Sequence, residues 1–493
     1  MKHKESAERL DNFELVNPNE FRSFCFRGEG CCNLVISAKG RQDGTRIVWR
    51  LAKKRNTAII SPKPKCRLLN IFLEMFISPF LCNSYLIKAR LVYISVSDLH
   101  HLAKIPALPH NMKLEEFSEL FNTTKHPAQS SRFQLANKRS NNNIENGRTA
   151  SAPCWSTTAV VPALEMPDAT RIPRPVPFAC GPTITVELKP KQGFRQAHPG
   201  IDLPFCNNCI LQIEKCHHSS AFHAMYDFCP LALYSGVRAR MQRALRSLLH
   251  QPHHNLRLFV DGNVVHEDGC AFEPHALGAA LFPAGASDGG GGGHGPSDGA
   301  NIDTFVSAIC CILAGVADDR REKFRLTEGS VLNNLLTAQR IDTVGMVRAF
   351  ELYKRLPDDV QNQLRRKANL LTRSYKSFPS LPINFLEFLQ KEDPRSLVER
   401  YLLAATIKDC SLMVSIRLVH EHAITNEMIS AVGDRGYIRV HGLDGRSFHF
   451  AYSIRIVDLD PKSAKNLENS YNRLMAGIRL LNANPHIHPP CVA

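Results

Sequence analysis

Two acidic residues stand at the ends of apolar, strand-like runs, where a carboxylate can reach into a site. Asp409 precedes the run CSLMVSIRLV, and Asp458 follows the run IRIV. Phosphotransferases hold a proton acceptor and a magnesium ligand in this way, because phosphoryl transfer depends on positioning and on charge stabilisation. The alternative is that both acids cap turns, and each acid taken alone fits that alternative better.

The stretch VELKPKQGF, residues 186–194, concentrates charge at a strand end. Lys189 and Lys191 alternate with Pro190, so the strand period of two aims both lysines at one face, with Glu187 on the same face. Such lysines could grip phosphate groups, which carry about −1.5 to −2 charges each at pH 7. Further cations along the chain are Lys215, Arg257, Lys462 and Lys465. Each cation taken alone is also consistent with a solvated side chain.

A short glycine turn, Gly28-Glu29-Gly30, lies between two strand-like runs, and Asn33 follows it. Glycines let backbone N–H groups approach phosphates without obstruction by side chains. The next run contains Arg50, which could reach the same phosphates from beneath the turn. An ordinary hairpin turn and a solvated basic edge are the alternatives.

Residue types that bind zinc occur in Cys206-Asn207-Asn208-Cys209, followed by Cys216-His217-His218 and His223. The spacing matches no standard closed zinc site, so we expect structural thiols here and no zinc site. The 16 cysteines follow no secreted disulfide framework, and the first residues lack the apolar segment of a secretory signal. We therefore expect reduced thiols in the cytosol or nucleus.

The elements that must position these residues divide the chain of 493 residues into two parts. Residues 20–60 alternate like a small sheet, and residues 85–105 predict a strand followed by a helix. The polar stretch 123–155 predicts a flexible connection. The sequence therefore predicts an α+β fold, with a small strand-rich part over residues 1–168 and a larger mixed part over residues 169–493.

The larger part alternates helical and strand-like patterns. Residues 231–251 predict one amphipathic helix, and residues 255–265 predict a hairpin around an Asp-Gly turn. Residues 283–300 are a low-complexity, glycine-rich insertion. Residues 301–407 are mostly helical, and a closing helix over residues 462–482 follows three strand-like runs.

Composition narrows the class of protein. Apolar residues make up 44% of the chain, enough for a sizeable core, and the longest apolar stretches, Leu68–Ile87 and Thr304–Val316, predict buried segments. The formal net charge is +15, which favours a polyanionic partner: a nucleic acid, an anionic membrane or a phosphorylated small molecule. A nucleic-acid binder needs a basic stripe with interleaved aromatic residues or a known module, and we find neither.

Taken in order, these segments resemble the inositol-pentakisphosphate 2-kinase family. The resemblance rests on FRGEGCCNL (26–34), VWRLAKKRN (48–56), VELKPKQGF, CPLALYSG (229–236), NLRLF (255–259), IKDCSLMVS (407–415) and VDLDPK (457–462). It implies a two-lobed divergent kinase-like fold, whose C-lobe carries an inositol-phosphate-binding subdomain. It also implies ATP- and Mg²⁺-dependent phosphorylation of the 2-hydroxyl of inositol 1,3,4,5,6-pentakisphosphate, which gives inositol hexakisphosphate (phytate), in the nucleus and cytoplasm.

The resemblance assigns a role to each candidate residue. Catalysis would rest on Asp409 as acid/base and on Lys189, and Mg²⁺ would bind Asp458 and Asp409. The residues expected to bind ATP are Gly28, Glu29, Gly30, Asn33, Arg50, Met166, Asp168 and Glu187. Those expected to bind substrate phosphates are Arg55, Arg132, Lys191, Lys215, Arg257, Lys462 and Lys465. The expected partner is inositol pentakisphosphate, without a membrane or a required nucleic acid, and the expected state is a monomer.

The sequence departs from the family pattern at several positions. Asn207 and Leu211 stand where the family has an Arg and a His, Ala232 replaces an Asp, and Asn466 replaces a substrate-binding Arg. The Cys-x-x-Cys of the plant members, expected between residues 300 and 390, does not occur. These departures leave an alternative open: a catalytically weakened member of the fold that binds inositol phosphates as a scaffold.

Overall fold

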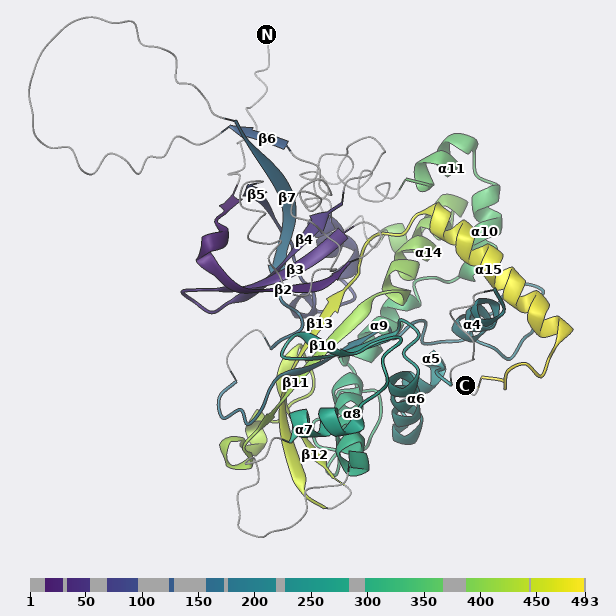
Figure 1. Cartoon of the computed structure of the whole chain (residues 1–493). Coiled ribbons are helices and arrows are strands. Elements are labelled where there is room, and N and C mark those ends of the chain that lie inside the picture. Colours follow the sequence, from purple (N-terminus) through teal and green to yellow (C-terminus); the bar gives the residue numbers. More distant parts are fainter. Residues whose placement is uncertain are drawn as a thin grey trace, which may run out of the picture. The chain divides into compact units, whose positions relative to one another are not determined.

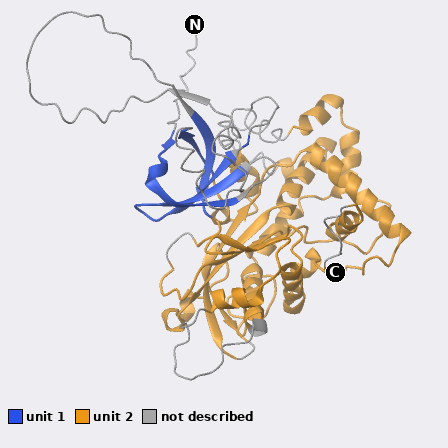
Figure 2. Cartoon of the chain, in the orientation of Figure 1, with its two compact units in different colours: residues 1–66, 89–168 blue, residues 67–88, 169–493 orange. Residues whose placement is uncertain are grey.

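The structure is a computed structural model, and it describes residues 14–29, 33–53, 69–95, 124–127, 157–172, 176–218, 227–282, 298–366, 387–442 and 445–491. The chain forms an α+β fold, as predicted, and divides into two compact units (Figure 2). Unit 1 comprises residues 1–66 and 89–168, and unit 2 comprises residues 67–88 and 169–493. The predicted division into lobes at residue 168 stays a prediction, and the structure groups residues 67–88 with the second unit.

Unit 1 is built on one sheet (Figure 1). Its strands are β1 (Leu15–Val16), β2 (Phe21–Glu29), β3 (Asn33–Gly40), β4 (Arg46–Ala52), β5 (Arg90–Ser95), β6 (Thr124–Pro127) and β7 (Thr157–Pro167). Their order is β1-β5-β7-β4-β3-β2, and β6 pairs with β7. The strand β6 corrects the predicted connection over residues 123–155 at four positions, and the rest of that segment lies outside the described residues.

The core of unit 1 fixes which face of the sheet each β4 side chain takes. Trp49 and Leu51 are fully buried in it. The Trp49 Nε1–H donates to Glu165 at 3.0 Å, and Arg90 forms an ion pair with the same carboxylate. Because side chains alternate along a strand, Arg50 lies on the opposite face from Trp49 and Leu51.

Unit 2 is built on a second, fully antiparallel sheet. Its strands are β8 (Ile184–Leu188), β9 (Leu256–Val260), β10 (Asn263–His266), β11 (Ser411–Val419), β12 (Arg435–His441) and β13 (Ser447–Val457), in the order β10-β9-β8-β11-β13-β12. The predicted hairpin over residues 255–265 is confirmed as β9 and β10. Asp261 and Gly262 take φ angles of +49° and +78°, as a two-residue hairpin turn requires.

The helices of unit 2 follow the predicted order. They are α4 (Asn207–His218), α5 (Pro230–Leu233), α6 (Arg238–His250), α7 (Pro274–Leu281), α8 (Asp298–Ala314), α9 (Val331–Gln339), α10 (Gly345–Lys354), α11 (Asp358–Leu364), α14 (Pro394–Lys408) and α15 (Ala464–Ala483). The helical character of residues 301–407 is thus confirmed where the chain is described, and α15 is the predicted closing helix. Among the described residues, the helices are all too short or too polar to cross a membrane.

One predicted helix is wrong in part. Residues 231–251 form two helices, because the chain turns between Leu233 and Arg238, where Gly236 takes a φ of +67°. The amphipathic pattern itself is confirmed within α6, whose apolar face is buried through Leu245, Leu248 and Leu249.

Two cores stabilise unit 2. One lies between the sheet and the helices α6, α8 and α9, and it contains most of the apolar stretch Thr304–Val316, as predicted. The other joins α4, α10, α14 and α15. The second core matters for the site, because it fixes α4, α14 and α15. These helices carry Lys215, Lys408 and Arg473, respectively.

Candidate functional site

Three neighbouring strands of unit 2, β8, β11 and β13, have ends that lie side by side at one end of the sheet. Leu188, the last residue of β8, pairs with Leu412 near the start of β11, and Ser411 pairs with Val457, the last residue of β13. The segments next to these strand ends carry Lys189, Lys191, Asp409 and Asp458. Antiparallel pairing therefore collects residues that are far apart in the sequence.

Asp409 lies between two lysines. Its Oδ1 accepts from Lys191 Nζ at 3.0 Å, and its Oδ2 accepts from Lys462 Nζ at 2.6 Å. Partial burial would raise the pKa of Asp409, but the positive charges and hydrogen bonds of Lys191 and Lys462 hold it well below its usual value. The carboxylate is consequently ionised throughout the physiological pH range.

Asp458 has an unusual backbone conformation. It directly follows β13 and takes a φ of +61°, which costs a non-glycine residue about 1–3 kcal/mol. Ser411 Oγ donates to its carboxylate at 2.9 Å, and Lys189 Nζ lies 3.8 Å from the same oxygen. The half-exposed carboxylate therefore keeps acceptor capacity for a further ligand.

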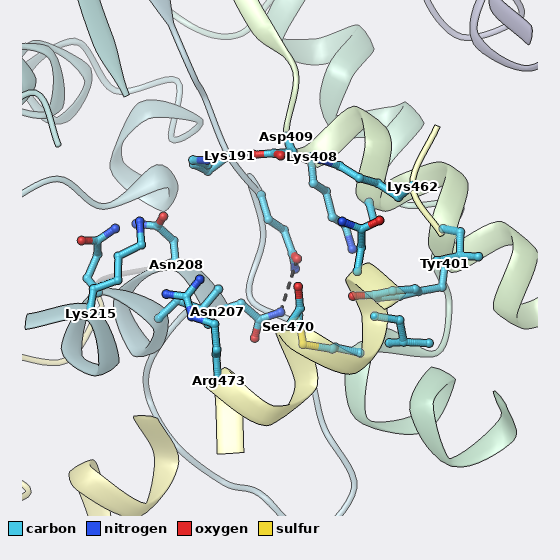
Figure 3. Close-up of a pocket in the computed structure, with 18 residues that line it drawn as sticks. Lys191, Asn207, Asn208, Lys215, Tyr401, Lys408, Asp409, Lys462, Ser470 and Arg473 are labelled. Carbon is cyan, nitrogen blue, oxygen red and sulfur yellow. Dashed lines mark hydrogen bonds and ion pairs between the residues drawn. The ribbon is translucent and has the colours of Figure 1, made fainter. Parts of the chain in front are cut away.

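A cavity of about 280 Å³ opens beside Asp409 (Figure 3). Five cationic side chains line it: Lys191, Lys215, Lys408, Lys462 and Arg473. Among the described residues that line it, Asp409 is the only acid. We call these five cations and Asp409 the cation pocket, and its excess of positive charge suits a polyanionic ligand.

Two cations of the cation pocket form ion pairs with acids that do not line it. Lys408 Nζ lies 2.7 Å from Asp342 Oδ2, and Arg473 makes two bonds to Glu214 at 2.8 and 2.6 Å. Burial, followed by the like charges of Lys191 and Arg473, lowers the pKa of Lys215. An incoming anion would relieve that repulsion.

The backbone at Lys191 is fixed by a buried glutamine of α9. Gln339 Nε2 donates to the Lys191 carbonyl at 2.8 Å, and its Oε1 accepts from the Gly193 N–H at 2.9 Å. Lys191 takes a φ of +59°, and a Cβ at Gly193 would lie 2.5 Å from the ring of Tyr234. The premise that a strand runs through Pro190 is wrong, because β8 ends at Leu188. Gln339 holds the backbone at Lys191, and the Lys189 N–H donates to the Asn255 carbonyl at 2.8 Å.

Glu187 and Arg257 form a pair of their own. They lie opposite each other on β8 and β9, and Arg257 Nε donates to Glu187 Oε2 at 2.9 Å. Neither residue lines the cation pocket. Lys465 is exposed on α15 and does not line the pocket either. Their predicted roles stay predictions.

Three of the four positions that depart from the family pattern lie in the cation pocket, and Ala232 does not. Asn207, Leu211 and Asn466 all line it. Asn207 Oδ1 is 2.9 Å from His198 Nε2, and Asn466 Oδ1 accepts from the Ser463 N–H at 3.0 Å as part of the α15 cap. The two asparagine side chains thus make hydrogen bonds within the protein.

Apart from Glu187, which lies on β8 of unit 2, the predicted nucleotide-binding residues belong to unit 1. Gly28 and Glu29 end β2, Asn33 begins β3, and Arg50 lies within β4. Met166 lies near the end of β7, where Val48 pairs with it.

Asp168 is buried and is paired with Arg27 at 3.3 Å. Gly30, Arg55 and Arg132 lie outside the described residues.

Three residues of the site escaped the sequence analysis: Lys408, Arg473 and Gln339. A signal existed for the first two. Lys408 directly precedes Asp409. Arg473 shares a helical face with Ser470, three residues before it, and with Asn466, four residues before Ser470. Gln339 carried no signal, because only the packing of α9 brings it to residue 191.

Comparison with known proteins covers most of the chain. A family model described as inositol-pentakisphosphate 2-kinase matches residues 26–474. An inositol-pentakisphosphate 2-kinase of Danio rerio is 26% identical over 353 residues, which are 62% of this chain and 68% of that protein. Inositol-pentakisphosphate 2-kinase IPK1 of Oryza sativa subsp. indica is 23% identical over 476 residues, which are 91% of each chain. The matched range includes every residue of the cation pocket and, apart from β1 and the start of β2, the strands of both sheets.

Proposed function

The chain belongs to the inositol-pentakisphosphate 2-kinase family, and from that premise we propose that it transfers the terminal phosphoryl group of ATP to the 2-hydroxyl of inositol 1,3,4,5,6-pentakisphosphate. The product is inositol hexakisphosphate. The observation that carries this proposal is the cation pocket, which five positive side chains and one carboxylate line together. The two-lobed kinase-like arrangement, the monomeric state and the nuclear and cytoplasmic location belong to the same proposal.

Charge supports a substrate with many phosphates. Five phosphate groups carry about −7.5 to −10 charges at pH 7. Scattered surface lysines could not compensate such a charge at close range, because solvent screens them. The ammonium groups of Lys191 and Lys462 are partly buried, and that of Lys408 is nearly buried, so their attraction for phosphate is stronger.

Asp409 would receive the substrate hydroxyl. Its low pKa makes it a weak base in the free protein, so its first task is to orient the hydroxyl group. When substrate phosphates draw Lys191 and Lys462 away, the pKa of Asp409 rises, and the carboxylate accepts the proton more readily. Lys189, on the adjoining turn, would stabilise charge on the phosphoryl group in transfer.

Asp458 fits the role of magnesium ligand. Mg²⁺ takes carboxylate oxygens, and Asp458 keeps free acceptor capacity beside the hydroxyl of Ser411. Asp409 could join it as a second ligand, in competition with the two lysines that already bond its oxygens. When bound, Mg²⁺ would neutralise charge on the terminal phosphates of ATP.

ATP would bind through unit 1. The antiparallel hairpin of β2 and β3, with Arg50 on the next strand, supports phosphate contacts by Gly28, Glu29, Gly30 and Asn33. Met166 and Asp168 would lie in the segment that touches adenine. Asp168 already pairs with Arg27, so its contribution would be to fix that segment.

A single-turnover assay tests the proposal. Excess protein is mixed with radiolabelled ATP, Mg²⁺ and inositol 1,3,4,5,6-pentakisphosphate, and the products are separated by anion exchange. Transfer of label to inositol hexakisphosphate is the expected result. Tight binding of the pentakisphosphate in calorimetry without any transfer would instead support the inositol-phosphate-binding scaffold.

A further inference from the structure

Four cysteine side chains meet at the start of α4. They are Cys206, Cys209, Cys229 and Cys491, and their sulfur atoms all lie within 4.8 Å of one another. The Sγ of Cys206 lies 3.5 Å from that of Cys209 and 3.9 Å from that of Cys229. All four are free thiols. We call this group the cysteine cluster.

Three separate segments of unit 2 build the cysteine cluster. Cys206 and Cys209 flank the first turn of α4, and Cys229 stands directly before α5. Cys491 comes from the segment after α15. Its backbone N–H donates to the Pro204 carbonyl at 2.9 Å, and its sulfur accepts from the Cys206 N–H at 3.3 Å. The chain thus directs a distant sulfur atom to this point and holds it there.

The spacing of the sulfur atoms matches a tetrahedral metal site. Zinc binds thiolates at about 2.3 Å, so four sulfur atoms around one zinc ion lie about 3.8 Å apart. The two separations of 3.5 and 3.9 Å bracket that value. A disulfide needs about 2.05 Å between its sulfur atoms, well below either separation. Cys206 and Cys209 are buried, and the Cys206 N–H already donates to the sulfur of Cys491, which would orient this sulfur as a ligand.

We propose that Cys206, Cys209, Cys229 and Cys491 bind one structural Zn²⁺ ion in a closed four-sulfur site. Four thiolates select zinc among the common divalent ions, and the absence of an open position makes the site structural. The proposal reverses the sequence-based expectation of no zinc site. Spacing along the sequence failed here, because Cys206 and Cys491 are separated by 285 positions.

The other candidate ligands do not form such a site. Cys216, His217 and His218 lie at the opposite end of α4, outside the cysteine cluster, and His223 is not among the described residues.

A second group, Asp318, Asp319 and His441, also gathers possible ligands. Arg439 and Arg238 neutralise its two carboxylates at 3.1 and 2.9 Å. Its charge is satisfied by protein, whereas the cysteine cluster contains no cation.

A zinc ion here would act on the cation pocket through α4. The residues of α4 that line the pocket are Asn207, Asn208, Leu211, Gln212 and Lys215. The same helix packs tightly on α15, where a Cβ at Gly477 would lie 2.5 Å from the Ile210 carbonyl oxygen. The metal would fix the start of α4 and the segment after α15 to each other. Its loss should therefore weaken substrate binding more than it slows transfer.

Metal analysis of the intact chain tests the proposal. The protein is purified under reducing conditions without added chelator, and its zinc content is measured by mass spectrometry. One zinc per chain is expected, with four sulfur neighbours at about 2.3 Å in X-ray absorption. Replacement by Co²⁺ should give a thiolate-to-cobalt charge-transfer band. A chain without zinc and without this band, or a disulfide within the cysteine cluster, would overturn the proposal.

Serine variants locate the site. Cys491→Ser lies near the end of the described chain, so it tests the metal with little risk to folding, whereas Cys209→Ser lies within a core. Both should lose zinc and melt at a lower temperature. Cys216→Ser, on the same helix but outside the cysteine cluster, is the matched control and should keep one zinc per chain. Full zinc content in Cys491→Ser and Cys209→Ser would exclude these sulfur atoms as ligands, whatever the activity of the variants.

Discussion

Asp409 owes its properties to its two neighbours. Lys191 and Lys462 hold its carboxylate from both sides, and they keep it ionised and oriented. The same contacts hold the two lysines in the pocket while no substrate is bound. Asp409 therefore has two tasks that a single substitution can separate.

Asp409→Asn should abolish phosphoryl transfer and leave substrate binding intact or tighter. The amide cannot accept the hydroxyl proton, and the loss of such a residue slows catalysis by roughly 10²- to 10⁴-fold. The freed lysines can meanwhile turn to substrate phosphates. Single-turnover rates and calorimetric affinities check both halves. The exposed Asp202→Asn is the control, and substantial turnover in Asp409→Asn with normal ATP binding would refute the role.

Asp458→Ala should weaken magnesium-dependent ATP binding. The side chain offers oxygen atoms that suit Mg²⁺, and alanine removes them. ATP affinity measured over a range of Mg²⁺ concentrations gives the result. An unchanged magnesium dependence would contradict the assignment. Because Asp458 also takes a positive φ, Asp458→Asn is a useful companion that retains the shape of the side chain and tolerates this conformation.

Lys191→Met should raise KM or lower kcat by roughly 10- to 100-fold, which corresponds to about 1.5–3 kcal/mol for a lost charge-assisted hydrogen bond. The salt sensitivity of substrate binding should fall as well, because one charge is removed. Lys354→Met, on the exposed end of α10, is the matched control. Steady-state kinetics at two ionic strengths measure both effects. Kinetics close to wild type would place Lys191 among solvated surface lysines.

Lys215 makes substrate binding depend on pH. Because the pKa of Lys215 is lowered, its ammonium group loses its proton at a lower pH than that of an ordinary lysine. Substrate phosphates favour the charged form, so affinity should fall as the pH rises through the pKa of the free protein. Lys215→Arg stays charged and should show a flatter dependence of KM on pH. Identical pH profiles in the two proteins would contradict this expectation.

The sequence singled out Asp409, Asp458, Lys189 and Lys191 because of their positions at strand ends. It could not predict which lysine contacts which acid, since Lys191 reaches Asp409 only through a turn with a positive φ. It also assigned phosphate binding to Arg257, whose guanidinium is paired with Glu187 in the structure. Such pairings depend on tertiary contacts that residue types and spacing do not record.

At the scale of elements, α9 supports the site by way of one side chain. Gln339 is fully buried and bonds the backbone on both sides of Gln192. The helix itself was expected from its apolar pattern. Its function as a clamp for the turn after β8 was not, because no motif marks a glutamine that acts on a segment far away in the sequence.

Gln339→Leu should destabilise the protein and weaken substrate binding. Leucine leaves the Lys191 carbonyl and the Gly193 N–H without partners, at a cost of about 1–3 kcal/mol. A purely structural role would lower the melting temperature alone, whereas a positioning role also raises KM more than it changes kcat at a temperature where the variant is folded. Thr337→Ala, exposed on the same helix, controls for changes in α9. An unaltered KM would limit Gln339 to stability.

At the scale of the whole molecule, the α+β class and the order of elements in unit 2 were predictable, because period and turn signals are local. The grouping of residues 67–88 with unit 2 was not predictable, since it depends on burial of Phe72 and Ile77 in a core formed by distant strands. The cysteine cluster was likewise not predictable from the sequence. Its parts are visible in the sequence, but their meeting is a property of the fold.

Substrate should stabilise the folded chain as a whole. At a ligand concentration of 100 times Kd, binding to the folded state adds about 2.7 kcal/mol to the free energy of unfolding. Thermal melts with inositol pentakisphosphate should therefore shift upward, and added salt should reduce the shift. Melts in sulfate at the same ionic strength are the control. An equal shift in sulfate would indicate general anion binding.

The bonds from Lys191 and Lys462 to Asp409 also affect which anions can bind in the cation pocket. A ligand that binds these lysines must compete with a carboxylate that is already in place. Orthophosphate offers one attachment point and would compete with that carboxylate one lysine at a time. A ring with several phosphates can engage both lysines, and its second attachment is intramolecular, with a high effective concentration. We therefore expect the pocket to respond to the number and spacing of phosphates on one molecule, so that free phosphate is a poor inhibitor.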